Sequence, residues 1–366
     1  MSVAMCRVFR TEQQQEWLEV LSRVVQYDFH HLPQYHRVEE RRLRATGQLF
    51  VYCEDDYLIA LPLLLCSMKE ILPKWNDATS VYGYTGPVAS QKTTPEAVVR
   101  NFHTALREAL VEQRVITVFS RLHPLLSQRD LLSGLGECRT IGPTVAIDLT
   151  LSPEQQRAQY RRSNKAVVNR QRREGRVTCV HDLQKGYLSD FANIYEETMR
   201  RVGAAEAYYF GENHFSELAR ELGPVLQLFI ALIDGRPAAA ALVTVCDGIV
   251  QYYLGGTRSE FLKFSPMSLV FDTVRLWANE IGARAFHLGG GVGAKQDSVF
   301  HYKAGFSHCR LEFATWRWVV EPEIYQELCD RWSRKNQLQA LEPDTADYFP
   351  AYRCPTTAGV QIRPKL

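Results

Sequence analysis

The stretch VLQLFIALIDGRPAAAALVTVCDGIVQYYL, residues 225–254, decides the fold of the second half of this 366-residue chain. Apolar runs of strand length are separated by two Asp-Gly pairs, Asp234-Gly235 and Asp247-Gly248. Asp-Gly between apolar runs is a strong signal for a two-residue hairpin turn. The stretch therefore predicts three antiparallel strands, over residues 225–233, 238–245 and 249–254.

Helices are predicted on both sides of these strands, because apolar residues recur there at helical spacing. In chain order the predicted segments are helices over 187–202 and 213–222, a helix over 268–281 after Pro266, a strand over 285–288, a strand over 308–318 and a helix over 323–337. The 285–288 strand runs into a glycine-rich turn, Gly289-Gly290-Gly291-Val292-Gly293. This half therefore consists of two helices, an antiparallel meander, a helix and further strands.

The first 150 residues are also mixed helix and strand, and residues 47–120 give a weak echo of the same order. Predicted helices cover 14–27 and 96–113, and predicted strands cover 48–52, 57–68, 115–120 and 144–149. Interleaved strands and helices favour an α/β unit, and 366 residues exceed the usual size of one compact domain. We therefore expect an N-terminal domain over 1–150, a C-terminal domain over 181–340 and a tail over 341–366.

A strongly basic segment separates the two expected domains. Ser152 is a suitable cap for a helix that begins at Pro153. Eight basic residues follow: Arg157, Arg161, Arg162, Lys165, Arg170, Arg172, Arg173 and Arg176. We interpret residues 151–180 as a basic helix at the junction of the domains.

Composition and charge exclude several classes of protein. With 46% hydrophobic and 23% charged residues, the chain has enough apolar material for a core, which argues against disorder. The net charge of +2 gives no global preference for nucleic acid or for an anionic membrane. The nine cysteines include no C-x-x-C pair, so we expect reduced thiols and no metal site. A signal-peptide pattern is missing and the most apolar stretch, 58–66, is too short for a bilayer, so we expect a cytoplasmic location.

Six short motifs follow one another along the chain: YGYTGP at 82–87, RLHPL at 121–125, RSNK at 162–165, YLGGT at 253–257, HLGGG at 287–291 and FHYKAGF at 300–306. Each motif alone is weak evidence, but the ordered set resembles the Fem-type branch of the GNAT acyltransferase superfamily, over residues 45–320. The resemblance implies an α/β (α+β type) fold of two tandem GNAT-like domains, with mixed central sheets flanked by helices. It also implies transfer of an acyl group onto nitrogen.

Donor and acceptor stay open at this point. Fem ligases add amino acids from aminoacyl-tRNA to peptidoglycan precursors, and similar proteins in natural-product pathways use the same donor on small amines. Other similar proteins are N-acetyltransferases of envelope-polysaccharide clusters. We expect an aminoacyltransferase whose partners are charged tRNA and an amine of an envelope precursor or small metabolite, with no cofactor. The alternatives are an acyl-CoA-dependent N-acetyltransferase acting on an amino sugar or small amine, and a non-catalytic RNA-binding protein, which the near-neutral charge disfavours.

Acyl transfer to an amine needs a base for the acceptor, a donor group for the tetrahedral oxyanion and alignment of the reactants. Lys303 matches the lysine of the family's Phe-Lys-x-x-Phe-like pattern and is expected to stabilise the oxyanion. The alternative is a surface lysine at a strand end. Asp297, His301 and His287 are candidates for the base, although a buried, hydrogen-bonded role is the commoner one for His287.

Further residues are candidates for binding the substrates. The basic segment offers Arg162, Asn164 and Lys165 to a phosphate, or else forms a solvated helix face. The glycines Gly289, Gly290 and Gly291 allow backbone N–H groups to approach an oxygen, or only satisfy a turn. Further anion or acceptor contacts are expected from Arg258, Arg121 and Tyr84, with core packing as the alternative for the aromatic ring.

One absent pattern bears on the donor. GNAT enzymes that use acetyl-CoA carry a loop such as Arg-x-x-Gly-x-Gly/Ala before a helix, whose amides bind the pyrophosphate. The corresponding segment here, 257–267, has no glycine and includes Pro266. The sequence therefore favours aminoacyl-tRNA over acyl-CoA.

Overall fold

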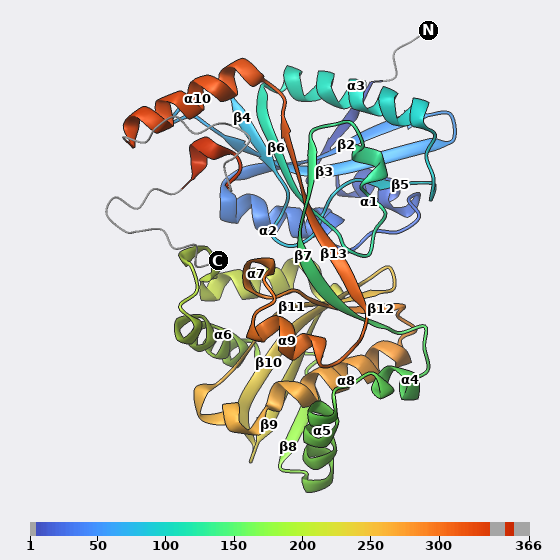
Figure 1. Cartoon of the computed structure of the whole chain (residues 1–366), viewed down its shortest axis with the longest axis vertical. Helices are drawn as coiled ribbons and strands as arrows, with labels where there is room; N and C mark the ends of the chain where they lie inside the picture. The colour runs from blue at the N-terminus through green and yellow to red at the C-terminus, as the bar shows by residue number, and fades with distance from the viewer. Residues whose placement is uncertain (1–4, 337–347, 355–366) are drawn as a thin grey trace. The chain divides into compact units, whose positions relative to one another are not determined.

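The computed structural model describes residues 5–336 and 348–354. It divides into two compact units: unit 1 comprises residues 1–141 and 313–366, and unit 2 comprises residues 142–312. In each unit a mixed sheet is flanked by helices (Figure 1). This arrangement is the predicted α/β fold of two GNAT-like domains.

The sheet of unit 2 is built around the predicted meander. Its strands, in spatial order, are β7 (Glu137–Asp148), β12 (Ala285–Gly289), β11 (Ile249–Thr257), β10 (Arg236–Cys246), β9 (Leu226–Ile233) and β8 (Val177–His181). All neighbours are antiparallel except β11 and β12. Both Asp-Gly pairs have positive φ at each residue, as a tight hairpin turn requires, so the predicted turns are confirmed.

Helices cover this sheet: α4 (Pro153–Ala158), α5 (Arg162–Glu174), α6 (Leu188–Val202), α7 (Glu212–Leu222), α8 (Pro266–Glu280) and α9 (Ser298–Ala304). Of these, α6 and α8 turn apolar residues toward it. The α8 helix connects the parallel strands β11 and β12 and packs on β8 to β11 (Figure 1). The core of the unit includes Val270, Phe271 and Val274 of α8. Such a crossover helix is what a parallel pair of strands requires.

Unit 1 repeats the same pairing pattern. In spatial order its strands are β1 (Arg7–Arg10), β2 (Ala45–Glu54), β3 (Tyr57–Ser67), β4 (Asn76–Thr79), β6 (Val115–Leu122) and β13 (Arg310–Val319), with β5 (Val88–Ala89) beside β3. The β4–β6 pair is parallel and the other pairs are antiparallel. Helices α1 (Gln14–Ser22), α2 (Pro33–Leu43), α3 (Glu96–Glu112) and α10 (Pro322–Lys335) complete the unit, and α3 lies in the β4–β6 connection as α8 lies between β11 and β12.

The boundaries of the units differ from the expected division near residues 150 and 340. The reason is that each unit completes its sheet with a strand that the other half of the chain begins or ends. In unit 2, β12 pairs with β7, which comes from the N-terminal half of the chain. In unit 1, β6 pairs with β13, which follows unit 2 in sequence. The chain thus crosses from unit 1 to unit 2 within β7, and back again within β13.

The basic segment is two helices inside unit 2, and not one junction helix. Ser152 caps α4 as predicted, in a reciprocal pair with Gln155. The break between α4 and α5 is held by Arg161, whose backbone N–H donates to the Gly305 carbonyl at 2.7 Å. This tertiary contact is invisible to helical periodicity.

Two further observations complete the comparison with the sequence. Residues 341–347 and 355–366 of the expected tail, and the last residue of the predicted 323–337 helix, lie outside the described part of the chain. None of the described helices is both long and apolar enough to span a membrane.

Candidate active site

Lys303 lies on the short helix α9, and not at a strand end. Its Nζ donates to the carbonyl oxygen of Gly290 at 2.8 Å and lies 5.3 Å from the centre of the Tyr252 ring. Burial of the ammonium lowers the pKa of Lys303 to about 8, against the opposing effect of the Asp297 carboxylate. The structure thus brings Lys303 together with the triple-glycine turn, and leaves its ammonium poorly hydrated.

The glycine turn has no room for a side chain at Gly291. A Cβ atom there would lie 2.1 Å from the Lys295 carbonyl oxygen and 2.3 Å from Oδ1 of Asp297. Gly289 has a φ of 76°, which disfavours other residues. The backbone of the turn is therefore fixed closely against the residues that begin α9.

Asp297 holds this turn and the helix together. Its Oδ1 accepts the Phe300 N–H at 2.9 Å, which caps α9, and its Oδ2 accepts the Val292 N–H at 3.0 Å. Both carboxylate oxygens therefore accept backbone N–H groups. This geometry favours a positioning role for Asp297 over that of a general base.

We expect Asp297→Ala to destabilise unit 2 by about 1–2 kcal/mol, the usual loss for a helix cap. Asp297→Asn is expected to lose less stability than Asp297→Ala, since the asparagine oxygen can still cap α9, although its amide nitrogen cannot accept the Val292 N–H. Thermal unfolding of the two variants measures the difference. If Asp297→Asn is more stable than Asp297→Ala but loses turnover at least as completely, Asp297 is a base and the positioning role is wrong.

The ends of β11 and β12 part beside Lys303. Their parallel pairing covers only residues 249–251 and 285–287. Beyond it, the Tyr302 hydroxyl is 3.0 Å from Oγ of Ser268, in the first turn of α8. The α9 helix is therefore anchored both to the glycine turn and to α8.

The RSNK motif lies against α9. The amide Nδ2 of Asn164 is buried, has no hydrogen-bond partner among the described residues, and lies 2.6 Å from where a Cβ on Gly305 would be. Arg161 donates from Nη2 to the His301 carbonyl at 3.2 Å. The sequence motifs at 162–165 and 300–306 are thus brought together, with one buried donor left unpaired.

The other candidate residues of unit 2 make fewer contacts with the glycine turn and α9. Arg162 begins α5 and is exposed, and Nζ of Lys165 donates to the Ala158 carbonyl at 2.8 Å. His301 is exposed. Arg258, at the end of β11, lies 3.8 Å from Asp190 of α6.

His287 has a buried, hydrogen-bonded role, which is the commoner role that we expected for it. It is fully buried, and its two ring nitrogens lie 2.7 Å from Oε1 of Gln251 and 2.9 Å from Oγ1 of Thr144. Both nitrogens are occupied, so no proton-accepting position remains for a substrate. His287 ties β12 to its neighbours β11 and β7.

Tyr84 and Arg121 belong to unit 1, whereas the other candidates belong to unit 2. The Tyr84 ring is half-buried and contacts His30, His123 and Phe313 edge-on. The Arg121 guanidinium lies 5.1 Å from the centre of the Phe119 ring.

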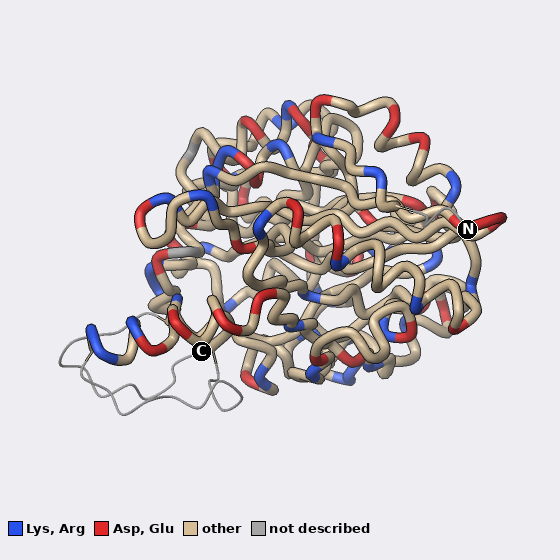
Figure 2. Tube along the Cα trace, turned by 90° about the horizontal axis from the view of Figure 1, so that it is seen from above, with Lys and Arg blue, Asp and Glu red and all other residues tan. Residues whose placement is uncertain are grey.

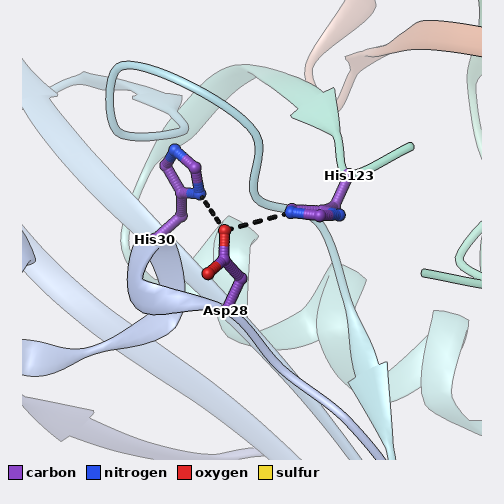
Figure 3. Close-up of side chains that lie close together, drawn as sticks. All are labelled: Asp28, His30 and His123. Atoms are coloured by element: carbon purple, nitrogen blue, oxygen red, sulfur yellow. Dashed lines mark hydrogen bonds and ion pairs between the residues drawn. The ribbon is translucent and has the colours of Figure 1, made fainter. Parts of the chain in front are cut away.

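A buried polar cluster beside Tyr84 was not predicted from the sequence. Asp28 Oδ2 is 2.9 Å from Nδ1 of His30 and 3.0 Å from Nε2 of His123, and both rings point toward the carboxylate (Figure 3). All three residues are almost completely buried. His123 is part of the RLHPL motif, but nothing in the sequence connects it with Asp28, 95 residues away.

These three residues have the types and the spacing of metal ligands. The hydrogen bonds argue against that use. The Leu125 N–H donates to Nδ1 of His123 at 3.2 Å, so the proton of this ring is on Nε2 and is donated to Asp28. Asp28 also accepts the Phe29 N–H at 2.7 Å. The hydrogen bonds from His123 and His30 hold the pKa of its carboxyl below the usual range despite burial. The cluster therefore fits a buried, hydrogen-bonded carboxylate and not a metal site.

Charges of both signs are interspersed along the chain (Figure 2). Within the basic segment, Arg157 and Arg172 pair with Asp272, and Arg176 pairs with Asp234. Arg162, Arg170 and Arg173 are exposed. The segment is therefore less positive than its composition suggests.

Comparisons with known proteins agree with this architecture. Residues 154–304 match the model of an acetyltransferase (GNAT) domain. A search of the curated proteins found no significant match. Among solved structures, FemX matches with a TM-score of 0.68 and 13% identity, over 86% of this chain and 98% of that one.

Two other structures match less closely. The C-terminal domain of a putative lysylphosphatidylglycerol synthetase from Agrobacterium fabrum matches with a TM-score of 0.50 and 14% identity, over 83% of this chain and 91% of that one. A protein of unknown function from Bacteroides thetaiotaomicron matches with a TM-score of 0.53 and 9% identity, over 85% and 98%. At sequence identities this low, the similarity to these structures establishes the fold alone. Residues 154–304 thus match a GNAT acetyltransferase domain, and the fold of the chain is similar to that of FemX.

Proposed function

We propose that this protein transfers an aminoacyl group from aminoacyl-tRNA to an amine of a cell-envelope precursor or small metabolite. The observation that carries the proposal is the ammonium of Lys303, held at Gly290 inside the segment that matches a GNAT domain. The named neighbours support the class of reaction, since one is FemX and another is named for lysylphosphatidylglycerol synthesis.

The reaction uses groups of unit 2. The acceptor amine attacks the ester carbonyl of the donor, and the ammonium of Lys303 donates a hydrogen bond to the oxyanion that forms. The orphaned amide of Asn164 is available as a second donor to the substrate. When the intermediate collapses, the C–O bond breaks, and the hydroxyl of tRNA leaves with the proton that the amine has lost.

The start of α8 bears on the choice of donor. Pro266, Met267 and Ser268 in its first turn are buried, and Ser268 contacts Tyr302. An open helix start with a glycine-rich approach, which would bind the pyrophosphate of CoA, is not found there. This favours tRNA as the donor. The description of the matching domain as an acetyltransferase favours the second candidate, N-acyl transfer from acyl-CoA to an amino sugar or small amine.

Reversing the charges of Arg162 and Lys165 to glutamate is expected to weaken binding of aminoacyl-tRNA. If each residue contacts one phosphate, the slope of log K against log salt should fall in magnitude by about 2, because each contact contributes about 0.9. Filter binding at several salt concentrations measures this slope. The matched control is Arg200→Glu with Arg220→Glu, which reverses two exposed charges on α6 and α7 of the same unit. Equal slopes in both double variants would contradict the proposed tRNA surface.

The donor is tested directly by incubating the protein with charged tRNA, or with acyl-CoAs, together with candidate amines, and reading the products by mass spectrometry. Aminoacylated amine formed only with tRNA supports the proposal. Acyl transfer from CoA, together with thermal stabilisation by sub-millimolar acetyl-CoA, would establish the second candidate instead.

A further inference from the structure

A solvent-open cavity of about 230 Å³ lies in unit 2 where α4, α5 and α8 meet. Its wall is mostly charged: it includes Glu154, Arg157, Arg172, Asp272 and Arg275. None of these residues takes part in the proposed reaction. The proposed reaction at Lys303 therefore does not account for this cavity.

Three guanidinium groups converge on one carboxylate in this wall. Asp272 Oδ1 lies 3.1 Å from Nη1 of Arg157 and 3.1 Å from Nη2 of Arg275, and Oδ2 lies 2.7 Å from Nη2 of Arg172. Asp272 is almost fully buried, and its cationic neighbours lower the pKa of its carboxyl, so it carries a full negative charge at neutral pH.

The charges of the wall do not cancel. Glu154 is the other acid of the wall, and its carboxylate is exposed and accepts the Ser152 hydroxyl at 2.9 Å. Three positive charges therefore face at most two negative ones, and one of those two is directed to the start of α4. Asp272 alone does not neutralise the three guanidinium groups, and the wall of the cavity carries a net positive charge.

The three arginines differ in what they can still bind. Arg275 is 2% exposed and donates to Asp272, Tyr160, Gln156 and the Pro153 carbonyl, so it is a structural group. The side chains of Arg157 and Arg172 are 28% and 43% exposed. Arg172 uses Nε and Nη2 on Asp272, and within the described residues its Nη1 has no acceptor. Arg157 donates from Nη1 to Asp272 and from Nη2 to Oδ1 of Asn169. Arg157 and Arg172 are thus each partly engaged, and their remaining N–H groups are accessible to a ligand.

We propose that this cavity binds a phosphate group, held by the guanidinium groups of Arg157 and Arg172. Guanidinium forks match the oxygens of phosphate and remain charged at all physiological pH values. Pockets for whole drug-sized ligands usually measure about 300–1,000 Å³. A cavity of about 230 Å³ instead suits one phosphate and a small part of the molecule that carries it. The carrier is either a polynucleotide backbone or a small phosphorylated molecule, and the first case rests on the proposed function.

The test is calorimetric titration of the full chain with inorganic phosphate at low ionic strength. Arg172→Gln is expected to weaken binding about tenfold or more, as loss of charged hydrogen bonds does. The control is Arg173→Gln, because Arg173 is adjacent, 76% exposed and outside the cavity wall. If Arg172→Gln fails to fold, Arg172→Lys takes its place: it keeps the charge beside Asp272 and removes the fork.

Competition then identifies the carrier. Uncharged tRNA that displaces phosphate from the wild type, but binds Arg172→Gln weakly, assigns the cavity to a polynucleotide phosphate. Phosphate binding that tRNA leaves unchanged assigns it to a small molecule. Unsaturable phosphate binding, or equal affinity in wild type and the Arg172 variant, overturns the proposal. Because no acyl transfer is measured, failure of the proposed function leaves this result unaffected.

Discussion

Lys303→Ala is expected to lower kcat for acyl transfer by about 100- to 1,000-fold, the range found when one donor to an oxyanion is removed. The loss follows from where the ammonium lies: it is poorly hydrated, and the Gly290 carbonyl is its hydrogen-bond partner. An interaction with developing negative charge is strong in such surroundings. Because the interaction forms in the transition state, KM should change much less than kcat.

The pH dependence gives an independent check on Lys303. With a pKa of about 8, the side chain is a charged hydrogen-bond donor below pH 8 and loses its positive charge above it. Wild-type activity should therefore fall as the pH rises through about 8, and this alkaline decline should be missing from the residual activity of Lys303→Ala. Steady-state kinetics from pH 6 to 10 measure both.

A second lysine of unit 2 provides the matched control. Lys263 also lies over an aromatic ring, with Nζ 5.2 Å from the centre of Phe264, but it is exposed. Lys263→Ala should leave kcat within about twofold of the wild type, since surface substitutions seldom do more. Undiminished turnover in Lys303→Ala would remove Lys303 from the mechanism.

Features encoded locally were predictable from the sequence. The two Asp-Gly turns fixed the meander, and Ser152 marked the start of α4. Lys303 and Gly290 are only 13 residues apart in the sequence. Their motifs were therefore expected to lie close together in the structure. The helix α9 was missed, although Asp297 stands as its cap, because seven residues are too few to show helical periodicity.

Features that depend on distant contacts were not predictable. The placement of β7 beside β12 and of β13 beside β6 depends on pairing between strands far apart in the chain. The sequence of an apolar strand does not identify the strand with which it pairs. Charge counting likewise could not show that Arg172 faces Asp272, 100 residues away. The helix α2 was missed because its sequence is strongly polar, although Pro33 at its first position was an available signal.

The second large effect concerns the stability of unit 1 in acid. We expect unit 1 to unfold between about pH 6 and pH 4, because it buries uncharged histidines. His31 and His36 are fully buried, and burial lowers the pKa of each to about 3. Their hydrogen bonds are to backbone: His31 bonds to the Gly86 carbonyl at 3.2 Å, and His36 to the His30 carbonyl at 3.1 Å.

The sign follows from proton binding in the two states. An unfolded histidine has a pKa of about 6.5, so below that pH the unfolded chain binds protons that the folded unit excludes. The stability is complete above pH 6.5 and is lost as the pH falls toward 3. At pH 4.5 each histidine costs on the order of 3 kcal/mol, and the pair on the order of 5 kcal/mol, which is comparable to the whole stability of many domains. Asp28 acts in the same direction at lower pH, since its carboxyl pKa is also lowered in the folded state.

His36→Gln tests this account, because glutamine removes one titrating group and can still donate to the His30 carbonyl. At equal stability at pH 7.5, this variant should reach its unfolding midpoint at a lower pH than the wild type. Tryptophan fluorescence measures the transition, and one of the six tryptophans, Trp17, packs on His36 at 5.2 Å between ring centres and donates to the His31 carbonyl. His308→Gln is the control, because His308 is exposed and should leave the midpoint unchanged. If both variants unfold at the same pH as the wild type, the buried imidazoles are not what limits stability in acid, and repulsion among the surface charges would have to account for it.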